Sequence, residues 1–239
     1  GEAMKITEDL EFRANLIRKI ADREFSERTG VHCSDLVYCL NKQVLRRLHL
    51  LPEREHDILL FSLGWATQRW LTGQDSDIPE ITVDGITVTC DSLVSVNKEN
   101  KREDFPWELK CTFQSSAHPI EENTTWLHQI MAQCYVVNSP VAYLSRFELM
   151  GNWKSVFGKK EEKALPENEK PTLHAYRLEF TKQELDDNWE WLKDRRHRFE
   201  NLLAGASLLP KVVALPSFGQ EWECQYCPEE YRKLCEEAQ

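Results

Sequence analysis

The sequence lacks the features that mark several protein classes. It contains no run of about 18 apolar residues, so we expect no membrane-spanning helix and no membrane partner. It has no low-complexity segment and no secretory signal, and Gly1 to Ala3 ahead of Met4 resemble an expression remnant. We therefore expect a cytoplasmic protein.

The chain also lacks an excess of positive charge. Its 30 lysine and arginine residues are outnumbered by 40 aspartate and glutamate residues, which gives a net charge of −10. This argues against a surface coated for nonspecific DNA binding. It leaves room for a local basic strip, and carboxylates that hold a metal add to the negative count. With 239 residues, 41% of them hydrophobic, the chain can form one large domain or a core with appendages.

The eight cysteines, in a chain without an export signal, indicate a reducing compartment and thiols that serve as ligands or core residues. A close group near the C-terminus, typical of a soft-metal site, comprises Cys224, Cys227 and Cys235. A fourth ligand must come from elsewhere; Cys39 is the first candidate and Cys33 the second. Four cysteines suit an iron–sulfur cluster or structural zinc, and free thiols are the alternative. The apolar-face cysteines expected in the core are Cys90, Cys111 and Cys134.

Residues 81–90 predict a β-hairpin, because apolar and polar residues alternate around Asp84-Gly85, a pair that favours a type I′ turn. A second short strand follows at 106–111, with Glu108 and Lys110 together on its outer face. If these two strands pair, Asp91, Glu108 and Lys110 meet at one edge of a small sheet.

Two carboxylates and an ammonium group at one edge suit a divalent cation such as Mg²⁺ or Mn²⁺. A metal lowers the pKa of a bound water and shields a phosphate, and a neighbouring lysine stabilises developing charge. The pattern predicts phosphodiester hydrolysis, in which Asp91, Glu108 and the backbone carbonyl of Leu109 bind metal and Lys110 orients the attacking water. The alternative for an E-x-K pair is an ordinary charged strand face.

Hydrophobic periodicity predicts the flanking elements. Helices are expected over residues 5–28, 34–50, 56–71, 121–138 and 181–205, the last opened by a capping box at Thr181; strands are expected over 141–149 and 173–180. Residues 152–172 are polar and predict a surface excursion. In the fourth helix, Gln129 and Gln133 share a face that points to the sheet edge or to solvent.

The last helix carries the basic residues of the chain's best candidate for contacting a phosphate backbone: Lys193, Arg195, Arg196, His197 and Arg198. A solvated helix face is the alternative. The eight tryptophans, among them Trp126, Trp189 and Trp191, are either core residues or stacking platforms.

The order of these features resembles the RecB-like branch of the PD-(D/E)xK nucleases, and within it the iron–sulfur exonucleases of the fourth CRISPR-associated protein family. The resemblance covers residues 34–138 and 222–235. The residues that match the nuclease motif are Asp91, Glu108, Lys110 and Gln129. The resemblance implies that Gln129 positions DNA or Lys110, and that a [4Fe–4S] cluster is held by Cys39, Cys224, Cys227 and Cys235.

The resemblance implies a restriction-endonuclease-like α/β fold with a central mixed sheet flanked by helices. We expect an N-terminal helical region over 1–78, a nuclease core over 79–204 and a cysteine-bearing segment over 205–239. The implied activity is a Mg²⁺- or Mn²⁺-dependent DNA exonuclease that acts on single-stranded DNA or DNA ends. It implies a part in trimming spacer precursors alongside a CRISPR integrase.

Two positions depart from the family pattern. Gln68 stands where the family has a histidine metal ligand, and Gln133 stands where tyrosine is expected. Both motivate a second hypothesis, a DNA-binding or scaffold protein that keeps the fold but catalyses weakly. A third hypothesis is a zinc-stapled interaction module.

Overall fold

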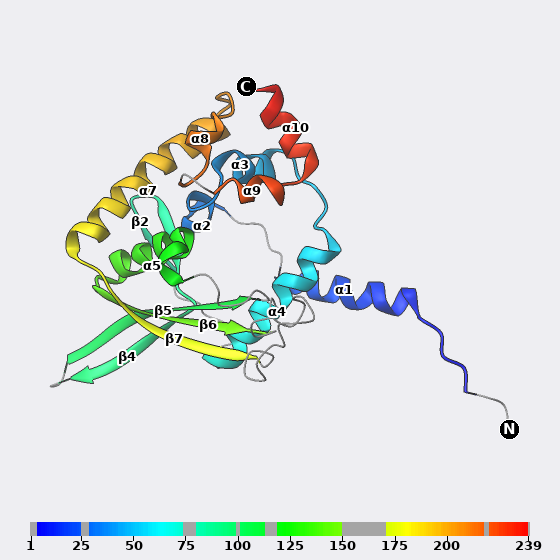
Figure 1. Ribbon diagram of the computed structural model, residues 1–239, viewed down its shortest axis with the longest axis horizontal. Helices are drawn as coiled ribbons and strands as arrows, with labels where there is room; N and C mark the ends of the chain where they lie inside the picture. Colours follow the sequence, from blue (N-terminus) through cyan, green and yellow to red (C-terminus); the bar gives the residue numbers. More distant parts are fainter. Residues whose placement is uncertain are drawn as a thin grey trace, which may run out of the picture.

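The structure is a computed structural model that describes residues 4–24, 29–73, 80–98, 101–112, 119–149, 171–217 and 220–238. Two mixed β-sheets are flanked by helices, which confirms the expected α/β class (Figure 1). Among the described helices, none has the length and apolar character needed to cross a membrane.

The first sheet has three strands in the order β1-β3-β2: β1 (Val31–His32), β2 (Glu80–Val83) and β3 (Ile86–Thr89). Strands β2 and β3 form the predicted hairpin. Asp84 and Gly85 have φ angles of 49° and 72°, the pair of positive values that a type I′ turn requires. The alternation also holds, since Ile86, Val88 and Cys90 are fully buried.

The second sheet has the order β4-β5-β6-β7: β4 (Ser92–Lys98), β5 (Lys101–Thr112), β6 (Val141–Glu148) and β7 (Thr172–Glu179). Strands β5 and β6 are parallel, and the other two pairs are antiparallel. The predicted pairing of 86–90 with 106–111 is wrong. Both edges of β3 are occupied, by β1 and β2, so β5 pairs with β4, a strand that the sequence analysis did not identify.

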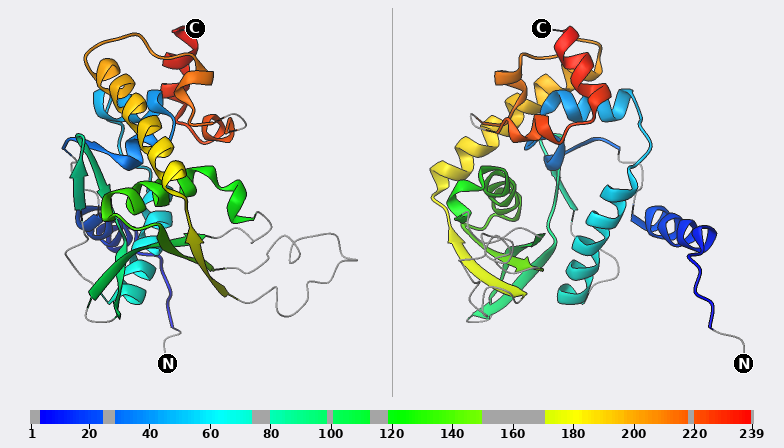
Figure 2. Two further views of the ribbon diagram at one scale, coloured as in Figure 1. Left: turned by 90° about the vertical axis from the view of Figure 1, so that its left-hand side faces the viewer. Right: turned by 45° about the vertical axis from the view of Figure 1, so that its right-hand side comes forward.

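Helices cover both faces of the second sheet (Figure 2). On one face, α5 (Thr124–Val137), preceded by the 3₁₀ turn η1 (Ile120–Glu122), packs Ile130 with Leu144 of β6. On the other face, α4 (Glu55–Thr72) brings the Thr67 hydroxyl to 3.6 Å from the sulfur of Cys111 on β5. Helix α1 (Leu10–Glu24) begins five residues later than predicted, and its expected end at 25–28 lies outside the described residues.

The helix predicted over 34–50 is two helices, α2 (Cys33–Leu36) and α3 (Leu40–Leu48). Arg195 explains the break, because its guanidinium donates to the carbonyls of Leu36 at 2.5 Å and Tyr38 at 2.7 Å. Those carbonyls therefore need no helical partner. The N-cap of α2 is His32, and the Asp35 carboxylate accepts the His32 backbone N–H at 2.8 Å.

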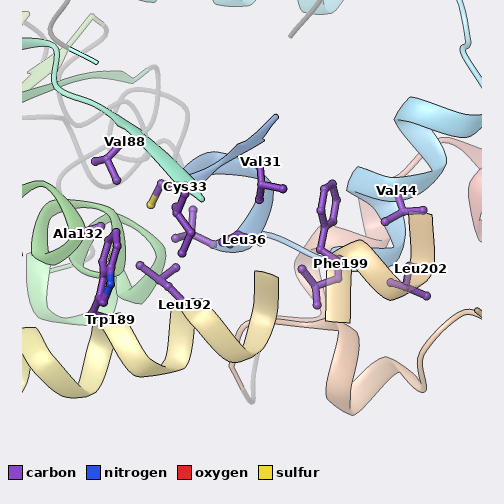
Figure 3. Close-up of a cluster of buried hydrophobic side chains, with 13 residues drawn as sticks. Val31, Cys33, Leu36, Val44, Val88, Ala132, Trp189, Leu192, Phe199 and Leu202 are labelled. Carbon is purple, nitrogen blue, oxygen red and sulfur yellow. The ribbon is translucent and has the colours of Figure 1, made fainter. Parts of the chain in front are cut away.

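The main hydrophobic core runs along α7 (Lys182–Leu203), which begins at the predicted capping box. Trp189, Leu192 and Phe199 of this helix pack against residues of α2, α3 and β3, as Figure 3 shows. Trp189 also stacks on Tyr135 of α5, with ring centroids 4.4 Å apart. One helix thereby holds the N-terminal segment, the first sheet and α5 together.

The C-terminal segment forms α8 (Lys211–Ala214), α9 (Trp222–Gln225) and α10 (Glu229–Glu237). It returns to the N-terminal helices, where the Tyr231 hydroxyl donates to the carbonyl of His49 at 2.7 Å (Figure 1). Of the polar excursion predicted at 152–172, residues 152–170 lie outside the described residues and Thr172 begins β7.

Candidate active site

Asp91 lies in the two-residue link between the sheets, after Cys90 and directly before β4. Ser92 pairs with Trp107, so the antiparallel register places Asp91 next to Glu108. Its Oδ2 accepts the backbone N–H of Leu109 at 2.7 Å. The chain's crossing from one sheet to the other therefore delivers this carboxylate to the strand that carries Glu108 and Lys110.

Glu108 is only 2% exposed, and α5 covers the strand face expected to be outermost. Its Oε1 accepts from Lys110 Nζ at 2.5 Å and from Gln129 Nε2 at 2.9 Å. Its Oε2 accepts from Gln133 Nε2 at 2.6 Å. The two glutamines, one helical turn apart, face the sheet and hold both oxygens of one carboxylate.

Lys110 is held as a cation. Its Nζ donates to Gln129 Oε1 at 3.1 Å and lies 5.8 Å from the centre of the Trp126 ring. Burial lowers the pKa of Lys110, but the charge of Glu108, with smaller contributions from Tyr38 and Asp91, outweighs it and raises the pKa. The side chain therefore supplies a fixed positive charge rather than a base at neutral pH.

Asp91 is the group of this cluster that titrates near neutrality. Burial, and then the charge of Glu108, raise the pKa of Asp91 to about 7, against the opposing effects of Lys110 and the Leu109 N–H. Two carboxylates this close repel each other unless a proton or a cation intervenes. A divalent cation would displace the proton from Asp91.

Gln133 is fully buried, and its Nε2 also donates to the carbonyl of Thr89 at 3.0 Å. Its Oε1 is buried without a hydrogen-bond partner among the described residues. An orphaned amide oxygen next to two carboxylates adds a hard oxygen donor, the kind that Mg²⁺ and Mn²⁺ prefer. The donor set therefore fits a hard divalent cation.

Gln68 is not joined to this cluster by any hydrogen bond between its amide and Asp91 or Glu108 within the described ranges. It is half-buried on α4, next to Thr67, which contacts Cys111 on the strand face away from Glu108. Its role as a metal ligand stays a prediction, as does that of the Leu109 carbonyl.

The candidate cluster cysteines lie where α3 meets the C-terminal helices α9 and α10. Cys39 is the N-cap of α3, and its backbone N–H donates to Glu223 Oε2, in α9, at 2.9 Å. The amide nitrogen of Asn41 lies 3.8 Å from the sulfur of Cys235 on α10. Cys33, by contrast, is 4% exposed and belongs to the main core.

All eight cysteines are free thiols. Burial raises the pKa of Cys39 to about 11, and the nearby thiols of Cys235 and Cys224 add to the shift. Burial likewise raises the pKa of Cys227 to about 11, and the same two thiols contribute. The four sulfurs thus share one region, although no three His, Cys, Asp or Glu side chains within the described segments form a preassembled metal site. A set of four thiols suits a soft metal by its chemistry.

The basic strip predicted on α7 is not a continuous surface. Arg195 is 3% exposed and donates to five backbone carbonyls, those of Leu36, Tyr38, Val213, Ala214 and Leu215. Lys193 pairs with Glu190 at 2.5 Å and Arg198 with Asp194 at 2.7 Å. Arg196 donates to the carbonyl of Asp84, and His197 lies 3.2 Å from the amide of Asn201. The lysine and arginine side chains of this strip pair with nearby carboxylates or with backbone carbonyls, so the helix fits a solvated and structural role better than a phosphate-binding role.

Trp126 and Tyr38 act on Lys110, and neither was predicted to belong to this site. The sequence alone suggested a core or stacking role for Trp126. Its i,i+3 spacing from Gln129 could have predicted that it lies near Lys110, because residues three apart share a helix face. Tyr38 acts on Lys110 from the break between α2 and α3, which no sequence pattern indicated.

No family model and no curated protein sequence matches this chain. Among solved structures, SSO0001 is similar with a TM-score of 0.53 at 15% identity, covering 96% of this chain and 98% of that one. A phage-related exonuclease from Haemophilus somnus 129PT is similar with a TM-score of 0.43 at 11% identity, covering 74% of this chain and 96% of that one. The first likeness shows a shared fold; the second has too low a TM-score to carry a conclusion.

Proposed function

We propose that this protein is a Mg²⁺- or Mn²⁺-dependent nuclease that acts on DNA. The observation that carries the proposal is one hydrogen-bonded cluster, in which Glu108 is bound by Lys110, Gln129 and Gln133 while Asp91 is anchored to the same strand. Carboxylates beside a fixed ammonium group, with one carboxyl poised near neutrality, suit metal-assisted phosphodiester hydrolysis.

Each residue has a role in this proposal. Asp91, Glu108 and the backbone carbonyl of Leu109 would hold the cation, which when bound would lower the pKa of a water and shield the phosphate charge. Lys110 orients the attacking water and stabilises negative charge that develops on the phosphate. Gln129 fixes Lys110 and Glu108 relative to each other, because its amide bonds to both.

The finer proposal concerns substrate and partner. The sequence resemblance supports an exonuclease on single-stranded DNA or DNA ends, with a part in trimming spacer precursors alongside a CRISPR integrase. It also supports a [4Fe–4S] cluster on Cys39, Cys224, Cys227 and Cys235. The backbone link from Cys39 to Glu223 supports the choice of Cys39 over Cys33.

The test is cleavage of end-labelled single-stranded and duplex DNA with Mn²⁺. Lys110→Ala is compared with Lys101→Ala, an exposed lysine at the other end of the same strand. We expect Lys110→Ala to lower the rate by on the order of 10²–10³-fold, the cost typical of losing one charge-stabilising donor. Equal rates for wild type and Lys110→Ala would remove this site from consideration.

The second candidate is a DNA-binding or scaffold protein with weak catalysis. Gln68 motivates it, because it occupies the position of the family's histidine ligand. Among the described contacts, its amide makes no hydrogen bond to Asp91 or Glu108. Tight DNA binding without product under Mg²⁺, Mn²⁺ or Co²⁺ would favour this candidate. Zinc in place of iron in an anaerobic preparation would favour the zinc-stapled module.

A further inference from the structure

The C-terminal segment contacts the helix that covers the proposed active site. Gln220 lies just before α9, and its side-chain amide reaches the first turn of α5. Its Nε2 donates to the hydroxyls of Thr124 at 2.5 Å and Thr125 at 3.1 Å. The Thr125 hydroxyl donates in return to Gln220 Oε1 at 3.3 Å. Neither the nuclease motif nor the proposed mechanism uses these residues.

This contact is buried and joins parts of the chain that lie 95 positions apart in the sequence. Gln220 is 8% exposed and Thr125 is 6% exposed. On the same segment, the hydroxyl of Ser217 lies 3.4 Å from that of Thr124. The Gln220 amide uses both its oxygen and its nitrogen on one helix turn, and this pairing fixes its orientation.

The first turn of α5 has little else to hold its side chains in place. Among the described contacts, the N-cap residue Asn123 makes no side-chain hydrogen bond to the first turn. A cap of that kind normally steadies the start of a helix, where the backbone N–H groups have no partner inside the helix. Gln220 instead anchors this turn from another segment, through the two threonine hydroxyls.

Thr125 lies on the face of α5 that meets the proposed active site. It precedes Gln129 by four residues and Gln133 by eight, so the three side chains share one face of the helix. Gln129 bonds to Lys110 Nζ at 3.1 Å and to Glu108 Oε1 at 2.9 Å. The turn that Gln220 anchors is therefore next to the turn that holds Lys110, and helical hydrogen bonds join the two turns.

We propose that Gln220 is a positioning residue of this active site, which acts on Lys110 through Thr125 and Gln129. Gln220 fixes the first turn of α5, and the Gln129 amide then meets both Lys110 and Glu108. Misplacing a catalytic group by about 1 Å can cost about 10²-fold in rate, so a residue that touches neither substrate nor metal can control the rate. The inference rests on the proposed nuclease function and deepens it, because it assigns part of the control of Lys110 to the C-terminal segment.

The test removes the hydrogen bonds with little change in volume. Thr125→Val replaces the hydroxyl by a methyl group, Thr125→Ser keeps the hydroxyl, and Gln220→Leu removes the amide on the other side. The control is Ser139→Ala, because Ser139 lies beyond the opposite end of α5, is also 6% exposed, and has its hydroxyl bonded to Val141.

Three measurements separate positioning from stability. Mn²⁺-dependent cleavage of labelled single-stranded DNA gives kcat and KM, and circular dichroism gives Tm. Proton–nitrogen correlation NMR of metal-free protein reports on the side-chain amide of Gln129, whose signal is assigned by its loss in Gln129→Ala.

We expect Thr125→Val and Gln220→Leu to lower kcat by about 10-fold or more with little change in KM. Thr125→Ser should keep most of the wild-type kcat. The Gln129 amide signal should shift in the first two variants and stay in place in Ser139→Ala, even where Ser139→Ala lowers Tm as much. Adding Gln220→Leu to Gln129→Ala should cost less than the two separate losses combined, because both act on the same contact.

An unchanged kcat and an unshifted Gln129 signal in Thr125→Val would overturn the proposal and leave a structural contact. A fall of kcat in Ser139→Ala as large as in Thr125→Val would overturn it too, as would fully additive losses for Gln220→Leu and Gln129→Ala. If Gln220→Leu does not fold, the comparison of Thr125→Val with Thr125→Ser decides.

The proposed function fails separately. Wild type that never cleaves DNA under any divalent ion contradicts the nuclease. The Gln129 signal in Thr125→Val then still decides whether the contact with Gln220 positions Gln129, because that measurement needs no activity.

Discussion

The proposed active site and the cysteine region differ in how completely the folded chain assembles them. Around Glu108, both carboxylate oxygens are paired and every partner comes from β5 or α5. Around Cys39, a backbone hydrogen bond to Glu223 brings the segments together, whereas the thiols do not form a preassembled metal site within the described segments. Ladder hydrogen bonds and helix packing fix the first region, and a backbone hydrogen bond from Cys39 joins the segments of the second.

The comparison teaches where each region's free energy comes from. A preassembled polar cluster is stable because each buried group has a partner, and it loses stability when one partner is removed. Thiols brought together without a bond gain stability when a metal binds, because the ligand's binding free energy adds to that of folding.

The largest effect is expected at Arg195, which joins the break between α2 and α3 to the C-terminal segment. It holds the carbonyls of Leu36 and Tyr38 on one side and those of 213–215 on the other. Arg195→Leu leaves five backbone acceptors, all buried or partly buried, without their donor, so the free energy of unfolding should fall by more than about 4 kcal/mol. Urea unfolding followed by circular dichroism measures it.

Arg198→Leu is the matched control, since Arg198 is exposed and pairs only one turn away with Asp194. Its effect should stay within about 0.5 kcal/mol. Similar losses of unfolding free energy for the two arginines would show that Arg195 does not hold the α2–α3 break and residues 213–215 together.

The next effect concerns the thiols. If Cys39, Cys224, Cys227 and Cys235 share one metal, Cys39→Ser and Cys224→Ser should each bring the metal content per chain close to zero and lower Tm. Cys33→Ser, in the main core, should leave the metal content unchanged. Elemental analysis of anaerobic preparations for iron and zinc makes the measurement, and loss of metal in Cys33→Ser but not Cys39→Ser would reverse the assignment.

The sequence predicted local patterns well and long-range pairing poorly. The Asp84-Gly85 turn, the Thr181 capping box and the shared face of Gln129 and Gln133 follow from residues within a few positions of each other. The strand partner of β5 does not follow from nearby residues. It depends on β1, which is distant in sequence and pairs with the edge of β3 that β5 would otherwise use.

Burial was the other quantity that the sequence could not supply. Glu108 looks like a residue of an exposed strand face, and Arg195 like one of a solvated helix face. Both are buried, because a glutamine pair neutralises the polarity of one and five carbonyls that of the other. Polar residues are buried where tertiary partners exist, and those partners lie far along the chain.

A smaller effect is expected at Gln133. Gln133→Leu removes the donor to Glu108 Oε2 and to the Thr89 carbonyl, so the free energy of unfolding should fall by about 1–3 kcal/mol. Gln183→Leu, an exposed glutamine on α7 that bonds to Asp187, should change it by less than about 0.5 kcal/mol. Added Mn²⁺ should widen the difference in unfolding free energy between wild type and Gln133→Leu, because the variant lacks one candidate oxygen donor to the cation. A difference independent of Mn²⁺ would argue against a cation at Glu108.

The last effect is a gradual one, a pH dependence at Asp91. The folded-state pKa of about 7 lies above the ordinary aspartate value of 3.8, so the folded chain keeps a proton that the unfolded chain releases. Metal-free protein should therefore lose stability as pH rises from about 4 to 7, by at most about 1.4 kcal/mol per pH unit. Asp91→Asn should abolish this slope.

Asp104→Asn is the opposite control. Hydrogen bonds from Ser95 and Arg102 lower the pKa of Asp104, so its contribution is present above the ordinary aspartate pKa and is lost as pH falls. Unfolding curves across that range distinguish the two, and a slope that survives in Asp91→Asn would assign it to another group.

The central claim is that Asp91 and Glu108 hold one divalent cation on the strand that carries Lys110. Anomalous X-ray scattering from crystals soaked in Mn²⁺ tests it most directly. We expect one strong manganese peak in the anomalous difference map, at about 2.0–2.3 Å from oxygens of both carboxylates, and no such peak in Asp91→Asn. A well-ordered crystal with no peak there, or with manganese bound only elsewhere, would contradict it.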